Sequence, residues 1–413
     1  MTESRTIRWG ILATGGIALT FARDLTAPPS TRGINDLKHT IVAAASSTSK
    51  SRAAQFLKDV GVPDDAKANA YGSYTDLVQD PNVDIIYIAT PHSHHYQNVR
   101  LCLEHGKHVL CEKAFTVNAA QARALVALAK EKGCFLMEAV WTRFFPLSKY
   151  VRDLVTEGNL GVVSRVVADT SMAHDPDTKF ADGKHRLVNP QLAGGALLDL
   201  GVYSLTWVFQ ALYSTLPPGE AGGRGKPKVE ALVRKLGTGV DGETSVLLAF
   251  AKGPGGGSND GGEGGGEAHG VATASFFTTT DPDGKGSAGP AIRIQGSKGE
   301  VTVQGPAFRP TRTKLVLHDG TVEEKEWKQP GPGKGSGWYN GFGGDMNDEG
   351  EGHGMFWEAD EAARCVLDGK GESEVFGLEE SCVIMEVMDS VREKGSVRFP
   401  EEIESLEYPL SLG

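Results

Sequence analysis

The first third of the chain alternates short apolar runs with stretches of helical periodicity. The run at 84–90 is nearly all apolar and β-branched, as expected of a strand buried on both faces of a parallel sheet. The intervening helical patterns end at Gly61, Gly106 and Gly133, and Asn118 can cap the last of them. With 135–140 as the last strand, the pattern predicts a Rossmann-type doubly wound α/β domain over 1–142. The runs located as strands are 7–13, 39–46, 84–90, 108–113 and 135–140.

The pattern changes from about residue 161, where strand-like runs follow one another through short turns. Neighbouring strands without helices between them favour a largely antiparallel sheet. Helical patterns lie at 194–213, 355–369 and 378–395. The remainder of the chain, 143–413, is therefore expected to be an α+β domain. Its strand candidates are 161–174, 228–237, 243–253, 270–280, 291–297, 300–305, 313–320 and 321–328.

Two glycine-rich stretches interrupt this pattern. Residues 253–266 lie between two strand candidates and are typical of a flexible hairpin extension. Residues 330–354 also carry Trp338, Tyr339 and Phe342, so they could be ordered against a partner subunit or a pocket mouth. A mobile surface loop is the simpler interpretation of 330–354, and we favour it.

Composition bounds the possible functions. A chain of 413 residues is long enough for two or three domains. Its formal net charge of −11 argues against nucleic acid as the partner. Five cysteines without a C-x-x-C pair indicate reduced thiols, and no secretory leader is evident. No apolar run looks long enough to span a bilayer, so we expect a cytoplasmic protein without a membrane partner.

A small-residue turn joins the first strand to the first helix. Dinucleotide-binding turns need small residues where the backbone approaches a pyrophosphate at a helix N-terminus. Here those positions are Ala13, Gly15 and Ala18, with alanine in place of the first glycine. A strand that runs directly into a helix supports cofactor binding, while a glycine-rich turn without a ligand is the alternative.

The end of the second strand usually distinguishes the two nicotinamide cofactors. A carboxylate there would bind a ribose 2′-hydroxyl, whereas small polar and basic residues leave room for a 2′-phosphate. Ser46, Ser47 and Thr48 occupy this position, and Lys50 and Arg52 follow. NADP is therefore favoured and NAD stays possible, since Lys50 and Arg52 could instead form a solvated helical turn.

Three histidines follow the strand at 84–90, where a ligand of an α/β sheet would lie. His92, His94 and His95 invite a metal hypothesis, but no carboxylate or cysteine accompanies them and they open a helix. We expect no metal, and interpret them as satisfied polar groups beside a cofactor.

A lysine and a tyrosine are candidates for acid–base chemistry. Lys113 ends the strand at 108–113, and Asp199 and Tyr203 share one face of a later helix. Tyrosine ordinarily has a pKa of about 10, and a nearby ammonium favours its phenolate. Such a pair beside a nicotinamide could oxidise an alcohol or hemiacetal hydroxyl. Alternatively, Asp199 is a helix-surface carboxylate and Tyr203 a core residue with a hydrated tip.

These segments together resemble the glucose–fructose oxidoreductase/inositol dehydrogenase (Gfo/Idh/MocA) family. Within it they are most similar to the branch of dimeric dihydrodiol dehydrogenase and NADP-dependent D-xylose 1-dehydrogenase. The resemblance covers nearly the whole chain apart from the two glycine-rich stretches. The segments that carry it are "RWGILATGGIA", "YIATPHSHHYQNVRLCLEHGKHVLCEKAFTVNAAQA", "MEAVWTRFFP", "RLVNPQLAGGALLDLGVYSL" and "MFWEADEAARCVLDGKGES".

The resemblance implies roles for individual residues. Lys113 matches the lysine of the family's Glu-Lys-Pro motif, which contacts the nicotinamide ribose and the substrate hydroxyl. Tyr203 matches the acid/base position, and Asp199 the acidic residue of that helix. Lys113, Arg143, Phe145, Asp199 and Tyr203 would contact substrate. The residues expected to hold the cofactor are Ala13, Thr14, Gly15, Gly16, Ile17, Ser46, Ser47, Arg52, Thr90, Pro91, His95, Glu112, Lys113, Trp141 and Arg143.

The chain departs from the family pattern at three positions. Ala114 replaces the proline of the Glu-Lys-Pro motif, Ala13 replaces a fingerprint glycine, and Ser47 stands where NADP users often have arginine. Glu112 would point away from Lys113 if the strand pleat continues, as a cofactor-side or structural acceptor.

Three functions are compatible with this sequence. The first is oxidation of an aldose such as D-xylose at its anomeric carbon to a lactone, by an NADP-dependent homodimer that pairs through its second-domain sheet. The second retains the machinery but uses a trans-dihydrodiol or a dicarbonyl. The third is a non-catalytic cofactor-binding regulator, against which the presence of Lys113, Asp199 and Tyr203 together counts.

Overall fold

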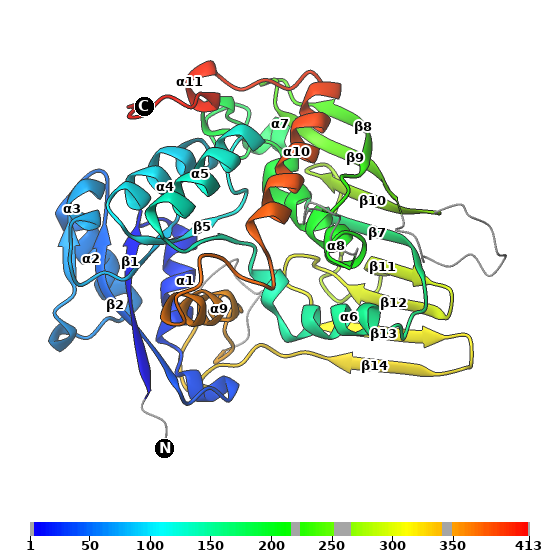
Figure 1. The fold of residues 1–413 in the computed structure, drawn as a ribbon, viewed down its shortest axis with the longest axis horizontal. Helices are drawn as coiled ribbons and strands as arrows, with labels where there is room; N and C mark the ends of the chain where they lie inside the picture. The colour runs from blue at the N-terminus through cyan, green and yellow to red at the C-terminus, as the bar shows by residue number, and fades with distance from the viewer. Residues whose placement is uncertain (1–3, 216–223, 252–265, 341–348, 412–413) are drawn as a thin grey trace. The chain divides into compact units, whose positions relative to one another are not determined.

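The computed structural model describes residues 4–215, 224–251, 266–340 and 349–411, and the chain forms two compact units (Figure 1). The first contains Met1–Phe144, Lys328–Leu378 and Ser405–Gly413, and the second Phe145–Trp327 and Glu379–Glu404. All residues after 142 were expected in the second domain. Instead, the segments Lys328–Leu378 and Ser405–Gly413 belong to the first unit. Almost all of the predicted flexible extension at 253–266 lies outside the described residues.

The first unit is built on a parallel sheet with strand order β3-β2-β1-β4-β5-β6, which confirms the doubly wound Rossmann prediction. β4 is buried along its whole length, as its apolar sequence requires. The sequence analysis located no strand at β3, a three-residue strand at the edge of the sheet. The strands are β1 (Arg5–Leu12), β2 (Leu37–Ala45), β3 (Asn69–Tyr71), β4 (Ile85–Ile88), β5 (His108–Glu112) and β6 (Leu136–Ala139).

Three predicted helix signals of this unit are confirmed, whereas the helix expected to end at Gly106 ends at Glu104 and the short helix at 74–78 was not predicted. The Asn118 side chain accepts a hydrogen bond from the Gln121 N–H, and Gly61 and Gly133 end their helices in the left-handed conformation. α1 packs against α2 and α9, and α4 packs beside α5. The helices are α1 (Gly16–Thr26), α2 (Lys50–Val60), α3 (Tyr74–Val78), α4 (His95–Glu104), α5 (Ala119–Lys132) and α9 (Phe356–Leu367).

A buried aspartate of α1 holds the glycine-rich segment that precedes α9. Asp24 is fully buried, and its carboxylate accepts hydrogen bonds from the N–H groups of His353, Gly354 and Met355 at 2.8–3.0 Å. The Asn340 side-chain amide donates to the same carboxylate at 2.5 Å. Within 330–354, Asn340 and the backbone at 353–354 are thus tied to α1, through acceptors of Asp24 that the sequence pattern does not reveal. The mobile surface loop expected for the remainder stays a prediction.

We expect Asp24→Asn to destabilise the first unit. The amide NH₂ of asparagine would face backbone N–H donors, leaving buried donors unsatisfied at a cost of about 2 to 4 kcal/mol. The midpoint of thermal unfolding should fall by about 5 °C or more. Asp59→Asn, at an exposed position of α2, is the control and should shift the midpoint little. Equal midpoints for the two variants would contradict this role of Asp24.

The second unit is built on an eight-stranded sheet with order β14-β13-β12-β11-β7-β10-β9-β8. Its pairs are antiparallel except β7 with β10, which confirms a mostly antiparallel sheet and all eight predicted strands. The strands are β7 (Val163–Ser171), β8 (Lys228–Lys235), β9 (Asp241–Ala251), β10 (Glu267–Ser275), β11 (Pro290–Gly296), β12 (Gly299–Gln304), β13 (Arg312–Leu317) and β14 (Val322–Glu326).

One face of this sheet carries the helix α8, which packs on β7 and β10 (Figure 1). The run Pro190–Leu212 that contains α8 is long and apolar enough to cross a membrane by composition, so the expectation that no run has this length was wrong. It is 94% buried inside the protein, as a core helix would be. The sequence analysis also missed α6. The helices are α6 (Pro146–Thr156), α7 (Pro176–Lys179), α8 (Val202–Leu212), α10 (Leu378–Lys394) and α11 (Glu401–Glu404).

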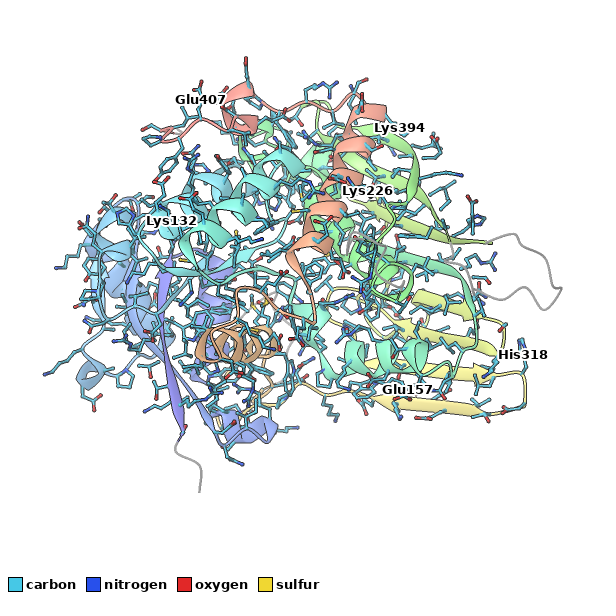
Figure 2. The ribbon with its side chains drawn as sticks, viewed as in Figure 1. Lys132, Glu157, Lys226, His318, Lys394 and Glu407 are labelled. Atoms are coloured by element: carbon cyan, nitrogen blue, oxygen red, sulfur yellow. The ribbon has the colours of Figure 1, made fainter. Side chains whose placement is uncertain are left out.

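Ion pairs join α10 to the edge of the sheet. Lys394 pairs with Glu230 of β8 at 2.9 Å, and Lys226, just before β8, pairs with Glu386 of α10 at 2.6 Å; both lysines are labelled in Figure 2. Such surface ion pairs contribute little to stability.

Candidate active site

The turn between β1 and α1 has the form that a pyrophosphate needs. Ala13 has φ = 78°, a left-handed conformation that explains why a glycine is expected there. Gly15 and Gly16 are exposed, and a Cβ built on either would meet no atom within 4 Å. No side chain caps α1, and its first turn holds no acidic residue. The bare helix N-terminus, which includes Thr14 and Ile17, therefore fits an anionic dinucleotide phosphate.

The next strand end carries the residues predicted to distinguish the cofactors. Ser47 and Arg52 are exposed, and Ser49 caps α2 by accepting from the Arg52 N–H. Ser46 is buried and bonds to the Thr48 hydroxyl at 2.9 Å. Because no carboxylate lies at this strand end, the site leaves room for a 2′-phosphate.

Tyr74 was not predicted to belong to this group. Burial raises the pKa of Tyr74, while hydrogen bonding with Ser47 and the charge of Arg52 lower it. The phenol therefore lies beside the two residues assigned to the 2′-phosphate. The aromatic residue three positions after the short strand β3 could have suggested it.

We expect Arg52→Ala to weaken NADP binding about tenfold while leaving NAD binding within twofold. The reason is that only the 2′-phosphate offers the guanidinium a charged partner. Lys58→Ala, at the other end of α2, is the control. Fluorescence titration with NADPH and NADH measures both affinities, and an equal loss for the two cofactors would refute the assignment.

The buried His95 side chain lies between the segments that follow two neighbouring strands. Its ring nitrogens lie 2.8 Å from the Ala114 carbonyl and 2.9 Å from the Thr90 carbonyl. Burial lowers the pKa of His95 to about 4, so the ring is neutral at physiological pH. His95 therefore aligns the segment after β4, which includes Pro91, with the segment after Lys113. The neutral ring carries one N–H and so donates to one of these two carbonyls.

Glu112 lies in the interior of the first unit. It is buried and accepts hydrogen bonds from the Tyr87 hydroxyl and, at 3.2 Å, from the Lys113 N–H. Burial, with the neighbouring charges of Glu112 and Asp24, raises the pKa of Glu358 well above its usual range. Glu112 acts here as a structural acceptor beneath Lys113, which is itself half-buried.

Trp141 and Arg143 follow β6 at the same sheet edge and are both buried. Trp141 meets His353 edge-on with ring centroids 5.1 Å apart. The Arg143 Nε donates to the Val375 carbonyl at 3.1 Å, and its guanidinium lies 5.4 Å from the Phe376 ring centroid. The first unit therefore gathers Ala13, Ser47, Thr90, Lys113 and Trp141 at the carboxyl ends of its strands, where ligands of open α/β sheets bind.

The second unit holds the remaining predicted residues. Asp199 and Tyr203 are buried on the helical segment that packs on β7 and β10. Asp199 pairs with Arg186 at 2.9 Å, and the Tyr203 ring lies 5.9 Å from that of Phe308. Arg186 and Phe308 were missed, although the arginine stands within the quoted family segment. Phe145, a predicted substrate contact, is fully buried at the start of α6.

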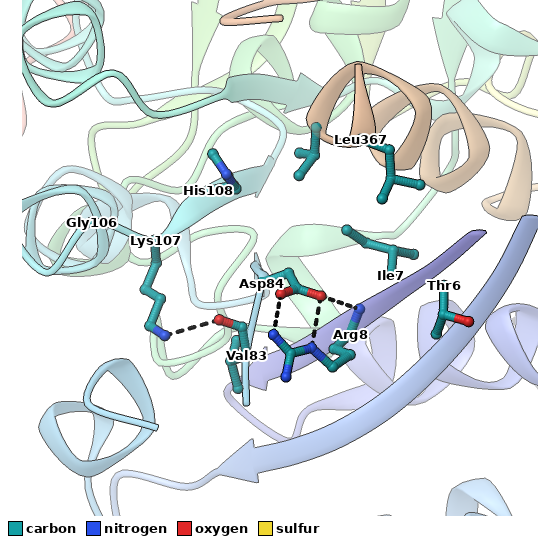
Figure 3. A pocket seen from close by; sticks show the side chains of 10 residues that line it. Thr6, Ile7, Arg8, Val83, Asp84, Gly106, Lys107, His108 and Leu367 are labelled. Atoms are coloured by element: carbon teal, nitrogen blue, oxygen red, sulfur yellow. Dashed lines mark hydrogen bonds and ion pairs between the residues drawn. The ribbon is translucent and has the colours of Figure 1, made fainter. Parts of the chain in front are cut away.

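A separate cavity lies at the opposite edge of the first sheet. It encloses about 450 Å³ between the amino ends of β1, β4 and β5 and the end of α9. Figure 3 shows Arg8 paired with Asp84, and Lys107 donating to the Val83 carbonyl at 2.9 Å. Its charged groups are thus engaged with the protein itself. No predicted site residue lines it.

The Rossmann unit, with its uncapped helix start at the carboxyl ends of the strands, is typical of nicotinamide-dependent oxidoreductases. The chain belongs to the Gfo/Idh/MocA family: residues 7–140 match "Oxidoreductase family, NAD-binding Rossmann fold" and 148–302 match "GFO/IDH/MocA C-terminal domain". The resemblance seen in the sequence is confirmed.

Relatives of known activity extend this comparison over nearly the full length. D-xylose 1-dehydrogenase (NADP(+)) of Hypocrea jecorina is 48% identical, with 99% of this chain and 98% of that protein covered. Trans-1,2-dihydrobenzene-1,2-diol dehydrogenase of Homo sapiens is 34% identical, with 96% and 99% covered. The aldose-aldose oxidoreductase of Caulobacter crescentus, solved with glycerol, has a TM-score of 0.68 at 22% identity, with 95% and 98% covered, and supports the fold.

Proposed function

We propose that this protein is an NADP-dependent dehydrogenase that oxidises an aldose, D-xylose or a similar pyranose, at its anomeric carbon to a lactone. The observation that carries the proposal is the 48% identity, across 99% of this chain, to a D-xylose 1-dehydrogenase (NADP(+)). The residues that acid–base chemistry requires, Lys113, Asp199 and Tyr203, are all present. A purely cofactor-binding regulator would not need all three.

The cofactor would be held by the uncapped start of α1 and by Ser47 and Arg52 at the end of β2. When bound, NADP accepts a hydride from the anomeric carbon. The Tyr203 oxygen takes the proton of the anomeric hydroxyl, so that the hydroxyl oxygen becomes the lactone carbonyl. A nearby ammonium favours the phenolate form that accepts this proton, and the mechanism assigns that role, together with a hydrogen bond to the reacting oxygen, to Lys113. Asp199, fixed by Arg186, accepts a hydrogen bond from a further sugar hydroxyl.

We expect Lys113→Met and Tyr203→Phe to lower kcat for the aldose by at least about 100-fold, because each removes a proton-handling group. Tyr213→Phe removes another buried phenol, one residue beyond α8, and should leave kcat within twofold. NADPH formation followed by absorbance measures all three. Turnover of either active-site variant within a few-fold of wild type would overturn the mechanism.

The substrate class is tested by a panel of aldoses, trans-dihydrodiols and dicarbonyls. The aldose proposal requires that kcat/KM be highest for a pentose or hexose pyranose. A higher kcat/KM for a dihydrodiol would instead match the activity named for the relative that is 34% identical. Binding of NADPH without turnover of any member of the panel would favour a regulator.

We propose further that two copies pair through the exposed face of the eight-stranded sheet, in a reducing compartment such as the cytoplasm. Leu232 of β8 is 78% exposed and Leu247 of β9 is 56% exposed, on neighbouring strands. Two large apolar side chains on one sheet face favour association with another apolar surface. The five cysteines are buried and free, which suits a reducing compartment.

Replacing Leu232 and Leu247 together by glutamate should convert a dimer to a monomer in light scattering after gel filtration. Two carboxylates opposed across a buried interface would have to be desolvated. Leu406→Glu, which changes an exposed leucine of the first unit, is the control. A dimer that persists in the double variant places the interface elsewhere.

A further inference from the structure

The helical segment that carries Asp199 and Tyr203 begins with an unusual turn. Leu197–Gly201 is π-helical and continues directly into α8. π-helical turns are rare and occur frequently at functional sites. The start of any helix leaves backbone N–H groups without partners, so a buried start requires an acceptor from elsewhere in the chain.

Asp241, the first residue of β9, supplies that acceptor. Its Oδ2 accepts a hydrogen bond from the Leu197 N–H at 2.6 Å. The side chain is 1% exposed, so water does not compete for this bond. Leu197 precedes Asp199 by two residues, and the bond therefore acts on the turn that presents the Asp199 carboxylate to Arg186.

Burying the Asp241 carboxylate at this position costs folding free energy. Gly195 has φ = 129°, and a Cβ there would lie 2.3 Å from Asp241 Oδ1. Among the residues that the structure describes, Oδ1 has no hydrogen-bond partner. A buried acceptor without a donor costs about 1 to 3 kcal/mol. A neutral cap would satisfy one N–H without burying a charge, so helix capping alone does not account for this aspartate.

The electrostatic surroundings agree with an anchoring role. Burial raises the pKa of Asp241 to about 6, whereas the Leu197 and Ala196 N–H groups and the charge of Arg392 on α10 lower it. At neutral pH the carboxylate is ionised, and its charge is directed at the positive end of the helical segment.

We propose that Asp241 is a positioning residue that holds the π-helical turn and thereby sets the orientation of Asp199 and Tyr203. The inference rests on the proposed function, because it assigns Asp241 a purpose only if those two residues handle the substrate. Asp241 itself touches neither substrate nor cofactor in this account. Its effect should therefore appear in kcat for the sugar and not in cofactor affinity.

The test compares Asp241→Asn with wild type. Asparagine keeps the volume and one acceptor but removes the charge and places a donor against the helix start. We expect kcat for the aldose to fall at least about tenfold, with NADPH affinity within twofold. Asp319→Asn is the control, because Asp319 also accepts a backbone N–H, that of Thr321 at 2.9 Å, in a turn far along the sheet. A lower melting temperature with unchanged kcat and KM would overturn the proposal.

Gly195→Ala perturbs the same contact by changing the residue that packs against Asp241. It replaces Asp241→Asn as the test if that variant does not fold. Its methyl group would collide with Asp241 Oδ1, so we expect a comparable loss of kcat. Wild-type kcat in this variant would also overturn the proposal.

Amide hydrogen exchange over 197–204 separates this inference from the proposed function. Faster exchange in Asp241→Asn than in wild type supports the anchor even if no aldose is turned over, since that outcome refutes only the substrate assignment. Unchanged protection of these amides overturns the anchor whatever the enzyme's substrate.

Discussion

Unpaired N–H groups at the starts of helices are the constraint on which this structure depends. Each helix start must find acceptors or face water. The chain meets this need with two buried aspartates. Asp24 accepts from N–H groups just ahead of α9, and Asp241 accepts from the Leu197 N–H at the start of the segment that carries Asp199. At Gly15 no side chain caps the helix, and the first turn of α1 holds no acidic residue. The start of α1 is therefore open to an anionic cofactor, at the strand end where ligands of α/β sheets bind.

The two aspartates also determine how distant parts of the sequence come together. Asp24 joins α1 to residues more than three hundred positions later in the sequence, which brings α9 into the Rossmann unit. Asp241 joins β9 to the start of the helical segment that packs on β7 and β10. In both cases burial raises the pKa of the carboxyl to about 6. The folded state therefore favours the protonated form of both carboxyls. Their contribution to the free energy of unfolding falls as the pH rises from about 4 to about 6.

The sequence predicted the elements better than their assembly. Apolar runs and capping residues such as Asn118 located most strands and helices, because they depend on local patterns. The return of 328–378 to the first unit could not be seen, since it depends on long-range hydrogen bonds to Asp24. The short strand β3 lacks an apolar run, and α6 was missed although Leu147, Val151 and Leu154 have helical spacing.

The candidate site also divides into residues that the sequence pattern revealed and residues whose contacts depend on the folded chain. Gly15, Ser47, Arg52 and Lys113 could be found because parallel strands place their carboxyl ends at one edge. Glu112 and His95 were expected beside the cofactor, Glu112 alternatively as a structural acceptor; both bond to other groups of the protein, and their contact with the cofactor stays a prediction. Arg186 and Asp241 escaped notice because an ion pair or a helix cap formed across the fold leaves no motif in the sequence.

Transfer of a labelled hydrogen tests the central claim most directly. D-Xylose carrying deuterium at its anomeric carbon would be oxidised with NADP, and the reduced cofactor analysed by mass spectrometry. The account predicts NADPH that carries one deuterium per molecule, formed together with xylonolactone. Unlabelled NADPH, or no reduction of NADP by the sugar, would contradict it.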